Sequence, residues 1–576
     1  MSRTRNPVDD FVRHLNAFTD TLSKVVSDGT DFGNFPEGLT SDLLDSAEEK
    51  LDLAASYMRT IKNSRQLACK LPREVLDLIF AYTMFRFRDF DPFPARPGYG
   101  GQWHPSILSG VCRYWRAVAI SCPAIWSTIY LSDSHACASL SFAQLSLRRS
   151  YGSLLNVYID YQAGIPDIAM NWISEDLVAQ SIRFSGFHIR EHRRHFSGAL
   201  YEVLSECPAP DLQSLTLQPD TLPASVAPDP LLFAGFLPSI KRLTTSRLRL
   251  WPSYRLTTLT HICFRESAFT VPEILDLLSC NPALEVLVLQ SNESSTQDAD
   301  DNSSLPTIGI SLPHLRRLDL TNYAMSSCAR ILNAIRPPPQ LNLTIDYVRP
   351  APSHTLLSTI SRLSLVSTIT TLVLRSSSYP ARLSIAGAGQ GAFAVAPGAD
   401  VHEAGSNQYM AGLLALLAAC PVRELVIDGD GVVTRVALWQ RIFLAAPLVA
   451  RLVIVPGNAA REPSGMAFLD ALCAPDETLG AALPCPLLKE LTVRGTTQRQ
   501  RSPGSPHASS GTKHLQQFLS DRRSRGFPVR KVVLEDYFPP SDILAEMKRL
   551  VDTVDLVNER RPSTSSDFYG SILNGY

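Results

Sequence analysis

The chain has 576 residues, of which 45% are hydrophobic and 19% charged, and its formal net charge is −1. This composition excludes an intrinsically disordered chain, and the length exceeds one typical globular core, so several domains or a repeat array are expected. The balanced charge gives no electrostatic reason to expect binding to nucleic acid or to an anionic membrane.

Eleven cysteines are present, an odd number, and none of them forms a CxxC pair. We therefore expect buried thiols in a reducing compartment and no disulfide framework. The N-terminus lacks the apolar core of a signal peptide, and the apolar run at 410–422 is shorter than the roughly 20 residues of a membrane span. These features predict a cytoplasmic or nuclear protein without a membrane segment.

Residues 1–40 are weakly patterned and are predicted to be mostly disordered, apart from a helix around 9–26. A helical segment is predicted over 41–68, because Ser41 is a good N-cap residue and apolar residues follow at three- and four-residue steps. The pattern fits either packing on the next segment or self-association, and packing is the favoured interpretation.

The most distinctive stretch begins at Leu71 with the sequence LPREVLDLIF. Proline is tolerated in the first turn of a helix, so Pro72 indicates that a helix starts here. Val75, Leu76 and Ile79 then follow at helical spacing and give this helix an apolar surface.

A second helix is predicted over 107–120, and Pro123 then opens a short turn. The apolar face of the second helix is predicted to consist of Val111, Trp115, Val118 and Ala119. These segments are too short to be stable alone, and they carry more apolar surface than three small helices can hide from water.

The ordered signatures LPxEVLxxIF, VCxxWR and PxxW resemble the F-box, a three-helix module that docks on a Skp-type adaptor of cullin-RING ubiquitin ligases. The likeness is greatest to the F-box-like type of mushroom-forming fungi, in which a helical segment precedes the box and irregular leucine-rich repeats follow it. Residues 69–131 are therefore assigned as an F-box-like domain. The resemblance implies that the adaptor is contacted by Leu71, Pro72, Val75, Leu76, Ile79, Val111, Cys112, Trp115 and Trp126.

One segment departs from the pattern of that family. A proline- and glycine-rich insert occupies 83–105, where the family has a short connection, and its composition predicts a loop that could shield part of the docking face. The alternative for the whole stretch is an ordinary helical subdomain packed on a larger body.

Beyond residue 131 a six-residue pattern recurs, with apolar residues at positions one, four and six. Positions four and six lie on one face of a strand, so each hexamer predicts a short strand with one buried face. Short helices precede several hexamers, as VPEILDLLSCNPA precedes LEVLVL. The hexamers occupy 212–217, 259–264, 284–289, 315–320, 369–374, 422–427, 449–454, 488–493 and 529–534.

A repeated helix, break and strand is the unit of a leucine-rich repeat, whose neighbours must stack to bury their apolar faces. Residues 132–557 are therefore predicted to form an irregular leucine-rich-repeat-like α/β solenoid, which makes the chain an α+α/β protein. A doubly wound sheet is the alternative, since it also alternates helices and strands. Insertions at 291–304, 376–407 and 496–512 are expected to leave the array, and 558–576 is expected to be a flexible tail.

No catalytic, cofactor or metal site is predicted. GAGQGA at 387–392 has the spacing of a loose dinucleotide-binding turn, but FAVAPG follows it and is not a helix that could hold a phosphate. His192 and His195 lie among arginines, whose charge disfavours a metal ion. We therefore expect a protein that is not an enzyme.

The resemblance implies a substrate receptor of a Skp–cullin–F-box ubiquitin ligase. The F-box-like domain would bind the adaptor, and through it a cullin, while the solenoid would bind an unidentified substrate protein. The alternatives are a scaffold that engages no ligase and an enzyme whose site no motif marks. Candidate substrate contacts are the middle residues of the hexamers: Gln213, Ser214, Glu285, Val286, Arg316, Arg317, Arg423, Glu424, Lys489 and Glu490.

Overall fold

The chain divides into two compact units in a computed structural model. A helical unit comprises Met1–Phe85 with Gly101–Ile125, and a sheet unit comprises Arg86–Gly100 with Trp126–Tyr576. The structure describes residues 7–28, 41–83, 105–132, 140–161, 164–191, 198–219, 232–235, 237, 239–248, 256–267, 269–291, 309–346, 355–378, 381–396, 406–429, 436–456, 467–473, 483–494, 508–535 and 539–557. Nearly all of the insert predicted at 83–105 lies outside these residues, as do most of the insertion at 291–304 and the whole tail at 558–576.

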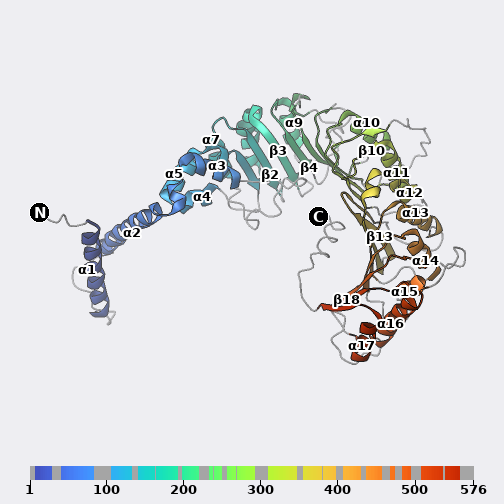
Figure 1. The fold of residues 1–576 in the computed structure, drawn as a ribbon. Helices are drawn as coiled ribbons and strands as arrows, with labels where there is room; N and C mark the ends of the chain where they lie inside the picture. Colours follow the sequence, from blue (N-terminus) through green and yellow to red (C-terminus); the bar gives the residue numbers. More distant parts are fainter. Residues whose placement is uncertain are drawn as a thin grey trace. The chain divides into compact units, whose positions relative to one another are not determined.

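All described elements of the helical unit are helices (Figure 1). They are α1 (Pro7–Asp28), α2 (Ser41–Ser64), the 3-10 helix η1 (Leu67–Lys70), α3 (Arg73–Thr83), α4 (Pro105–Val111) and α5 (Arg113–Ser121), and the short α6 (Pro123–Trp126) spans the boundary to the sheet unit. The helices predicted around 9–26 and from Ser41 are confirmed, and α1 extends beyond its predicted range at both ends.

The single helix predicted over 107–120 is wrong, because the chain breaks into α4 and α5 at Cys112. Cys112 has an extended backbone and acts as the N-cap of α5, where its sulfur accepts a hydrogen bond from the Trp115 N–H at 3.4 Å. Arg116 Nε donates to the Ser109 carbonyl at 2.8 Å and so satisfies an acceptor at the end of α4. Val111 therefore leaves the predicted apolar face and is exposed.

The core of the helical unit lies between α3, α4 and α5. Leu76 and Phe80 of α3 are buried, as are Leu108 of α4 and Val118 of α5. The rings of Phe80 and Trp115 meet edge to face with centroids 5.1 Å apart, an arrangement that adds to the burial of apolar area. Leu71 is tied to α5 through its carbonyl, which accepts a hydrogen bond from the Tyr114 hydroxyl at 2.8 Å.

Helix α2 meets α5 through one arginine. Arg113 donates to the Ser56 hydroxyl at 2.9 Å, and its guanidinium lies 5.0 Å from the centre of the Tyr57 ring. Other apolar side chains of α2, such as Met58 and Ile61, remain exposed. The contact is therefore polar and local, and it leaves Leu51, Met58 and Ile61, three of the apolar residues that predicted this helix, exposed.

The sheet unit contains a seventeen-stranded, mostly parallel sheet within the described residues. In spatial order its strands are β1 (Thr128–Ser132), β2 (Leu155–Tyr161), β3 (Phe184–Glu191), β4 (Ser214–Gln218), β5 (Arg242–Ser246), β6 (His261–Arg265), β7 (Val286–Gln290), β9 (Arg317–Thr321), β11 (Asn342–Asp346), β14 (Ala392–Ala396), β13 (Ala381–Ala388), β12 (Thr371–Ser378), β15 (Glu424–Gly429), β16 (Arg451–Pro456), β17 (Glu490–Arg494), β18 (Lys531–Glu535) and β19 (Thr553–Val557). A separate parallel pair is formed by β8 (Ile310–Ser311) and β10 (Ile335–Arg336).

Helices connect the strands and lie along one side of the sheet (Figure 1). They are α7 (Leu140–Arg149), α8 (Asp167–Trp172), η3 (Ile173–Leu177), η4 (Val178–Arg183), α9 (Gly198–Glu206), η5 (Phe233–Gly235), α10 (Val271–Cys280), α11 (Met325–Ala334), α12 (Thr355–Ile360), η6 (Ser364–Thr368), α13 (Ser406–Ala419), α14 (Val436–Ala445), α15 (Ala467–Cys473), α16 (Ala508–Ser524) and α17 (Ser541–Leu550).

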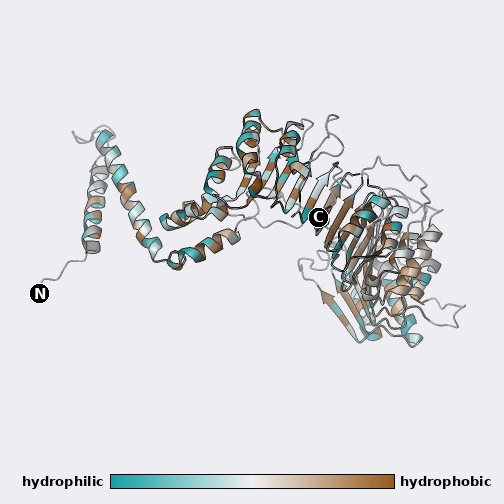
Figure 2. Cartoon of the chain, turned by 90° about the horizontal axis from the view of Figure 1, so that it is seen from above, coloured by the Kyte–Doolittle hydropathy of each residue, from teal (hydrophilic) through white to brown (hydrophobic). Residues whose placement is uncertain are grey.

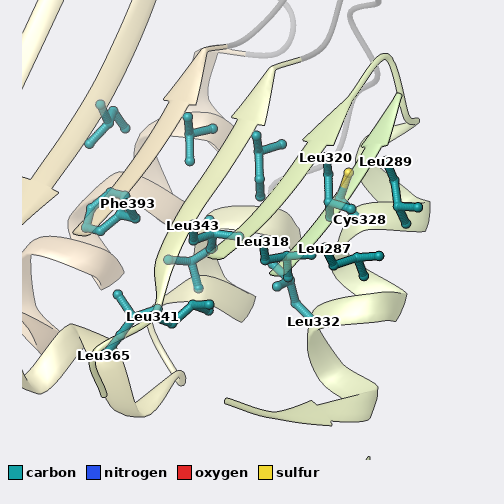
Figure 3. Close-up of a cluster of buried hydrophobic side chains, with 14 of the residues drawn as sticks. Leu287, Leu289, Leu318, Leu320, Cys328, Leu332, Leu341, Leu343, Leu365 and Phe393 are labelled. Atoms are coloured by element: carbon teal, nitrogen blue, oxygen red, sulfur yellow. The ribbon is translucent and has the colours of Figure 1, made fainter. Parts of the chain in front are cut away.

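All nine hexamers coincide with strands, and each strand begins at position three of its hexamer. Positions one, four and six are buried in every hexamer and belong to one continuous core between sheet and helices. Figure 3 shows this core around β7, β9 and β11, where Leu287, Leu318 and Leu343 point toward α11. Because parallel strands pair in register, each position forms a row that runs from strand to strand.

The segment 376–407 does not leave the array as predicted. Its described residues form the rest of β12 and the antiparallel strands β13 and β14, which insert between β12 and β11 in the same sheet. The turn between β13 and β14 contains Gly391, where a Cβ atom would lie 2.6 Å from the Leu341 carbonyl oxygen. The glycines of GAGQGA thus allow neighbouring backbone segments to come close to this turn. This packing requirement explains why the glycines are spaced as in a nucleotide-binding turn.

Candidate functional site

Helix α3 is apolar on two sides. Leu76 and Phe80 fill the core, while the exposed fractions of the apolar side chains on the other side are 39% for Val75, 71% for Leu78, 40% for Ile79 and 70% for Tyr82. The exposed positions follow one another at i, i+3, i+4 and i+7, so they lie on one face of the helix. We call these four residues the α3 stripe.

The α3 stripe is unusual for a surface helix, whose outward face is normally polar. Contiguous exposed apolar side chains on a protein surface mark sites of interaction with another protein or a membrane. Two further apolar residues, Ile107 and Val111, are about half exposed and lie one turn apart on α4. The helical unit therefore presents apolar surface beyond what its own core buries.

The nine residues predicted to contact an adaptor divide into three groups. Pro72, Val75, Ile79 and Val111 are exposed. Those that are half-buried are Leu71, Cys112 and Trp115, and those that are buried are Leu76 and Trp126. Leu78 and Tyr82, the two most exposed members of the α3 stripe, are not among the predicted contacts, although their spacing from Val75 places them on the same helix face.

Trp126 belongs to the sheet unit. It packs against Phe142 of α7, with ring centroids 5.9 Å apart, and the Arg149 guanidinium lies 4.4 Å above its ring. The sequence WSTIYL from Trp126 repeats the one-four-six pattern, and Trp126 occupies position one ahead of β1. Its burial is therefore explained by its place at the start of the array.

The second candidate surface is the sheet face formed by positions three, five and seven of the hexamers, here called the non-helical face. Its middle row crosses all seventeen strands, and several of these strands are brown, and so hydrophobic, in Figure 2. In spatial order the row is Tyr130, Tyr158, His188, Thr216, Thr244, Cys263, Val288, Asp319, Thr344, Ala394, Ala386, Val373, Val426, Val453, Thr492, Val533 and Asp555.

The predicted substrate contacts lie at hexamer positions two and three, and only position three belongs to the non-helical face. The residues at hexamer position two that are exposed are Gln213, Arg316, Arg423 and Lys489, while Glu285 is half-buried. The residues at position three that are half-buried are Ser214, Arg317, Glu424 and Glu490. Val286 was expected to be exposed, but it is buried, because it lies within the sheet between His261 and Arg317.

A polar cluster occupies the middle row near β2 and β3. The His188 ring stacks on Tyr158 at 4.7 Å between centroids, and its Nδ1 lies 2.9 Å from the Thr216 hydroxyl. Beside it, Arg190 forms a bidentate ion pair with Asp160, with Nε–Oδ1 and Nη2–Oδ2 distances of 3.0 and 2.6 Å. Bidentate pairs between arginine and a carboxylate are among the strong hydrogen bonds of proteins, and their two parallel contacts specify the geometry of both side chains.

Burial and the nearby charge of Arg242 lower the pKa of His188 to about 3. The native state thus holds a neutral imidazole, whereas the unfolded chain binds a proton at an ordinary pKa of about 6.5. The stability that His188 contributes is therefore complete above pH 6.5 and is lost as the pH falls from there toward 3.

We expect this group alone to lower the free energy of unfolding by about 2 kcal/mol between pH 7 and pH 5. Urea unfolding of the wild type and of His188→Gln at both pH values measures the effect. The variant should show a smaller loss than the wild type, and equal losses in the two proteins would contradict the assignment.

The two ends of the non-helical face differ in charge. On β1–β9 the charged residues of its three rows are Asp160, Arg190, Arg242, Arg265, Arg317 and Asp319. On β15–β19 they are Glu424, Asp428, Arg451, Glu490, Arg494, Lys531, Glu535 and Asp555. The first end is therefore net basic and the second net acidic.

From β14 through β16 the middle row is apolar and buried. Val373, Val426 and Val453 pack with Ala386 and Ala394 in a cluster separate from the main core. Next to it, Arg451 bridges Glu424 at 3.3 Å and Glu490 at 3.5 Å. The charges of Glu424, Arg451 and Glu490 are therefore matched across neighbouring strands.

The described residues contain no group of three or more His, Cys, Asp or Glu side chains that could hold a metal ion. His192 and His195 lie outside the described part of the chain. Among the helices that the structure describes, none is long and apolar enough to cross a membrane.

No protein-family model matches this chain, and no curated protein matches it either.

Proposed function

We propose that this chain is an F-box-type substrate receptor of a Skp–cullin–F-box ubiquitin ligase, with a leucine-rich-repeat-like solenoid as its substrate-binding part. The α3 stripe is the observation that carries the proposal. It places Val75, Leu78, Ile79 and Tyr82 on the outward face of the helix whose sequence carries the first F-box signature. An amphipathic helix that offers an apolar stripe is suited to a hydrophobic groove of an adaptor.

The sheet unit supports the second half of the proposal. The middle row of the non-helical face crosses all seventeen strands, so this face offers an extended surface for a protein substrate. The receptor would carry out no bond chemistry. It would hold the substrate near a ubiquitin-charged enzyme and so raise the effective concentration of the reactants.

Binding of a purified Skp-family adaptor to the purified full-length chain tests the proposal. We expect a 1:1 complex with a Kd below about 1 μM, measured by calorimetry and by co-elution on size exclusion. Cooperative unfolding in urea serves as the control that the protein is folded. If folded protein does not bind the adaptor at tens of micromolar, the ligase role is rejected.

The second candidate is a scaffold that binds proteins through the sheet unit and engages no ligase. The long insert between α3 and α4 favours it, since an insert of this length could cover these two helices. Deleting residues 86–102 separates the candidates. Adaptor binding that appears only after the deletion indicates a shielded F-box, and no binding in either form indicates the scaffold.

A further inference from the structure

Two cysteines far apart in sequence meet in the helical unit. Cys69 of η1 and Cys112, the N-cap of α5, are 43 residues apart, and their sulfur atoms lie 3.8 Å from each other. Both side chains are half-buried, so solvent reaches the pair. Two thiols in contact need only a short movement to reach the S–S bond length of about 2.05 Å.

The element that carries Cys69 is held loosely. The four residues of η1 include none that is buried, and the Cys69 N–H bonds to the nearby Gln66 carbonyl at 3.0 Å. A short segment with few buried contacts shifts at low cost in free energy. Cys112, by contrast, is fixed by its capping role at α5. We therefore expect Cys69 to move toward Cys112.

We propose that Cys69 and Cys112 are a redox-modification site that closes reversibly into a disulfide by exchange with a small-molecule disulfide. One cysteine thiolate attacks a sulfur of the small disulfide, forms a mixed disulfide and releases one small thiolate. The second cysteine thiolate then attacks the mixed disulfide, forms the Cys69–Cys112 bond and releases the second small thiolate. The two protein thiols are oxidised with loss of two protons, and the small disulfide is reduced to two thiols.

Other cysteines of the chain are poorer sites. Burial raises the pKa of Cys328, Cys420 and Cys485 to about 12, so these remain protonated, and their burial also blocks access. The pKa of Cys69 is raised as well, by burial and by its hydrogen bond with Cys112. Exchange requires the thiolate, so closure should become faster as the pH rises.

Closure would act on the docking surface, and this consequence rests on the proposed function. Cys69 lies two residues before Leu71, and Cys112 follows Val111 directly. Drawing the sulfurs together displaces the start of α3 relative to the start of α5. We expect the affinity for the adaptor to fall by about tenfold, equivalent to 1.4 kcal/mol.

The test uses the reduced full-length protein, incubated with graded ratios of oxidised to reduced glutathione. Free thiols are alkylated, and the peptides are identified by mass spectrometry. We expect a Cys69–Cys112 linked peptide that dithiothreitol removes. Cys69→Ser and Cys112→Ser should each abolish it, whereas Cys207→Ser, at a half-buried cysteine of the sheet unit, should not. The proposal is overturned if folded wild type yields only alkylated cysteines or glutathione adducts at these positions.

Adaptor binding by the reduced and the oxidised protein separates the two proposals. If the linked peptide forms but the affinity for the adaptor does not change, the redox site is supported and its proposed effect on docking is rejected. If the reduced protein does not bind the adaptor, the proposed function fails, and the peptide result still decides the redox site.

Discussion

The double substitution Leu78→Ala/Tyr82→Ala is expected to weaken adaptor binding at least about thirtyfold, because each side chain that anchors an interface hot spot contributes more than about 1 kcal/mol. Both side chains are about 70% exposed in the free protein, so the free energy of unfolding should change by less than about 0.5 kcal/mol. Calorimetric titration with the adaptor measures the first quantity, and urea unfolding measures the second.

A matched control comes from the sheet unit. Ile168 and Tyr151 are exposed to 71% and 73%, nearly the same as Leu78 and Tyr82. Ile168→Ala/Tyr151→Ala removes the same kinds of side chain and should leave adaptor affinity unchanged. If both double variants lose affinity alike, the effect reflects general surface apolarity, and the α3 stripe is not the docking site.

The substitution Arg522→Ala should destabilise the sheet unit by about 3–5 kcal/mol, since it strips several buried carbonyl groups of their donors. Arg522 lies on α16 and is fully buried. Its guanidinium donates to four carbonyl oxygens, those of Leu472 at 3.3 Å, Pro484 at 3.0 Å, Cys485 at 2.9 Å and Phe527 at 3.2 Å. This one side chain thereby connects α15, the residues that precede β17 and the turn that follows α16.

Urea unfolding and hydrogen exchange measure the effect of Arg522→Ala. Amides in 467–473 and 483–494 should exchange faster than in the wild type, because the carbonyl groups of these two segments lose their hydrogen bonds to the guanidinium. Arg522→Lys should recover only part of the stability, since an ammonium group lacks the planar fork of five donors. Lys513→Ala, at an exposed position of the same helix, serves as the control. A loss below about 1 kcal/mol for Arg522→Ala would show that water replaces the guanidinium.

The strands of the sheet could be predicted because their signal is local. Side chains alternate from one face of a strand to the other, so apolar residues at positions four and six mark a buried face in any hexamer. The same pattern occurs at 126–131, 184–189 and 551–556, ahead of or within β1, β3 and β19, in addition to the nine predicted hexamers. The insertion of β13 and β14 could not be foreseen, because pairing between strands depends on residues distant in sequence.

The sequence by itself determined the helical character of 73–83 and of most of 107–120, the strands at the nine hexamers and their buried positions, since each depends on spacing within one element. Only the tertiary structure decided which side of α3 faces the core and that Cys112 breaks the second helix. It also decided that Trp126 belongs to the sheet unit, that Arg522 is buried and that Cys69 meets Cys112. These features depend on contacts between elements, and helical periodicity marks an apolar face without telling whether the same chain or another protein covers it.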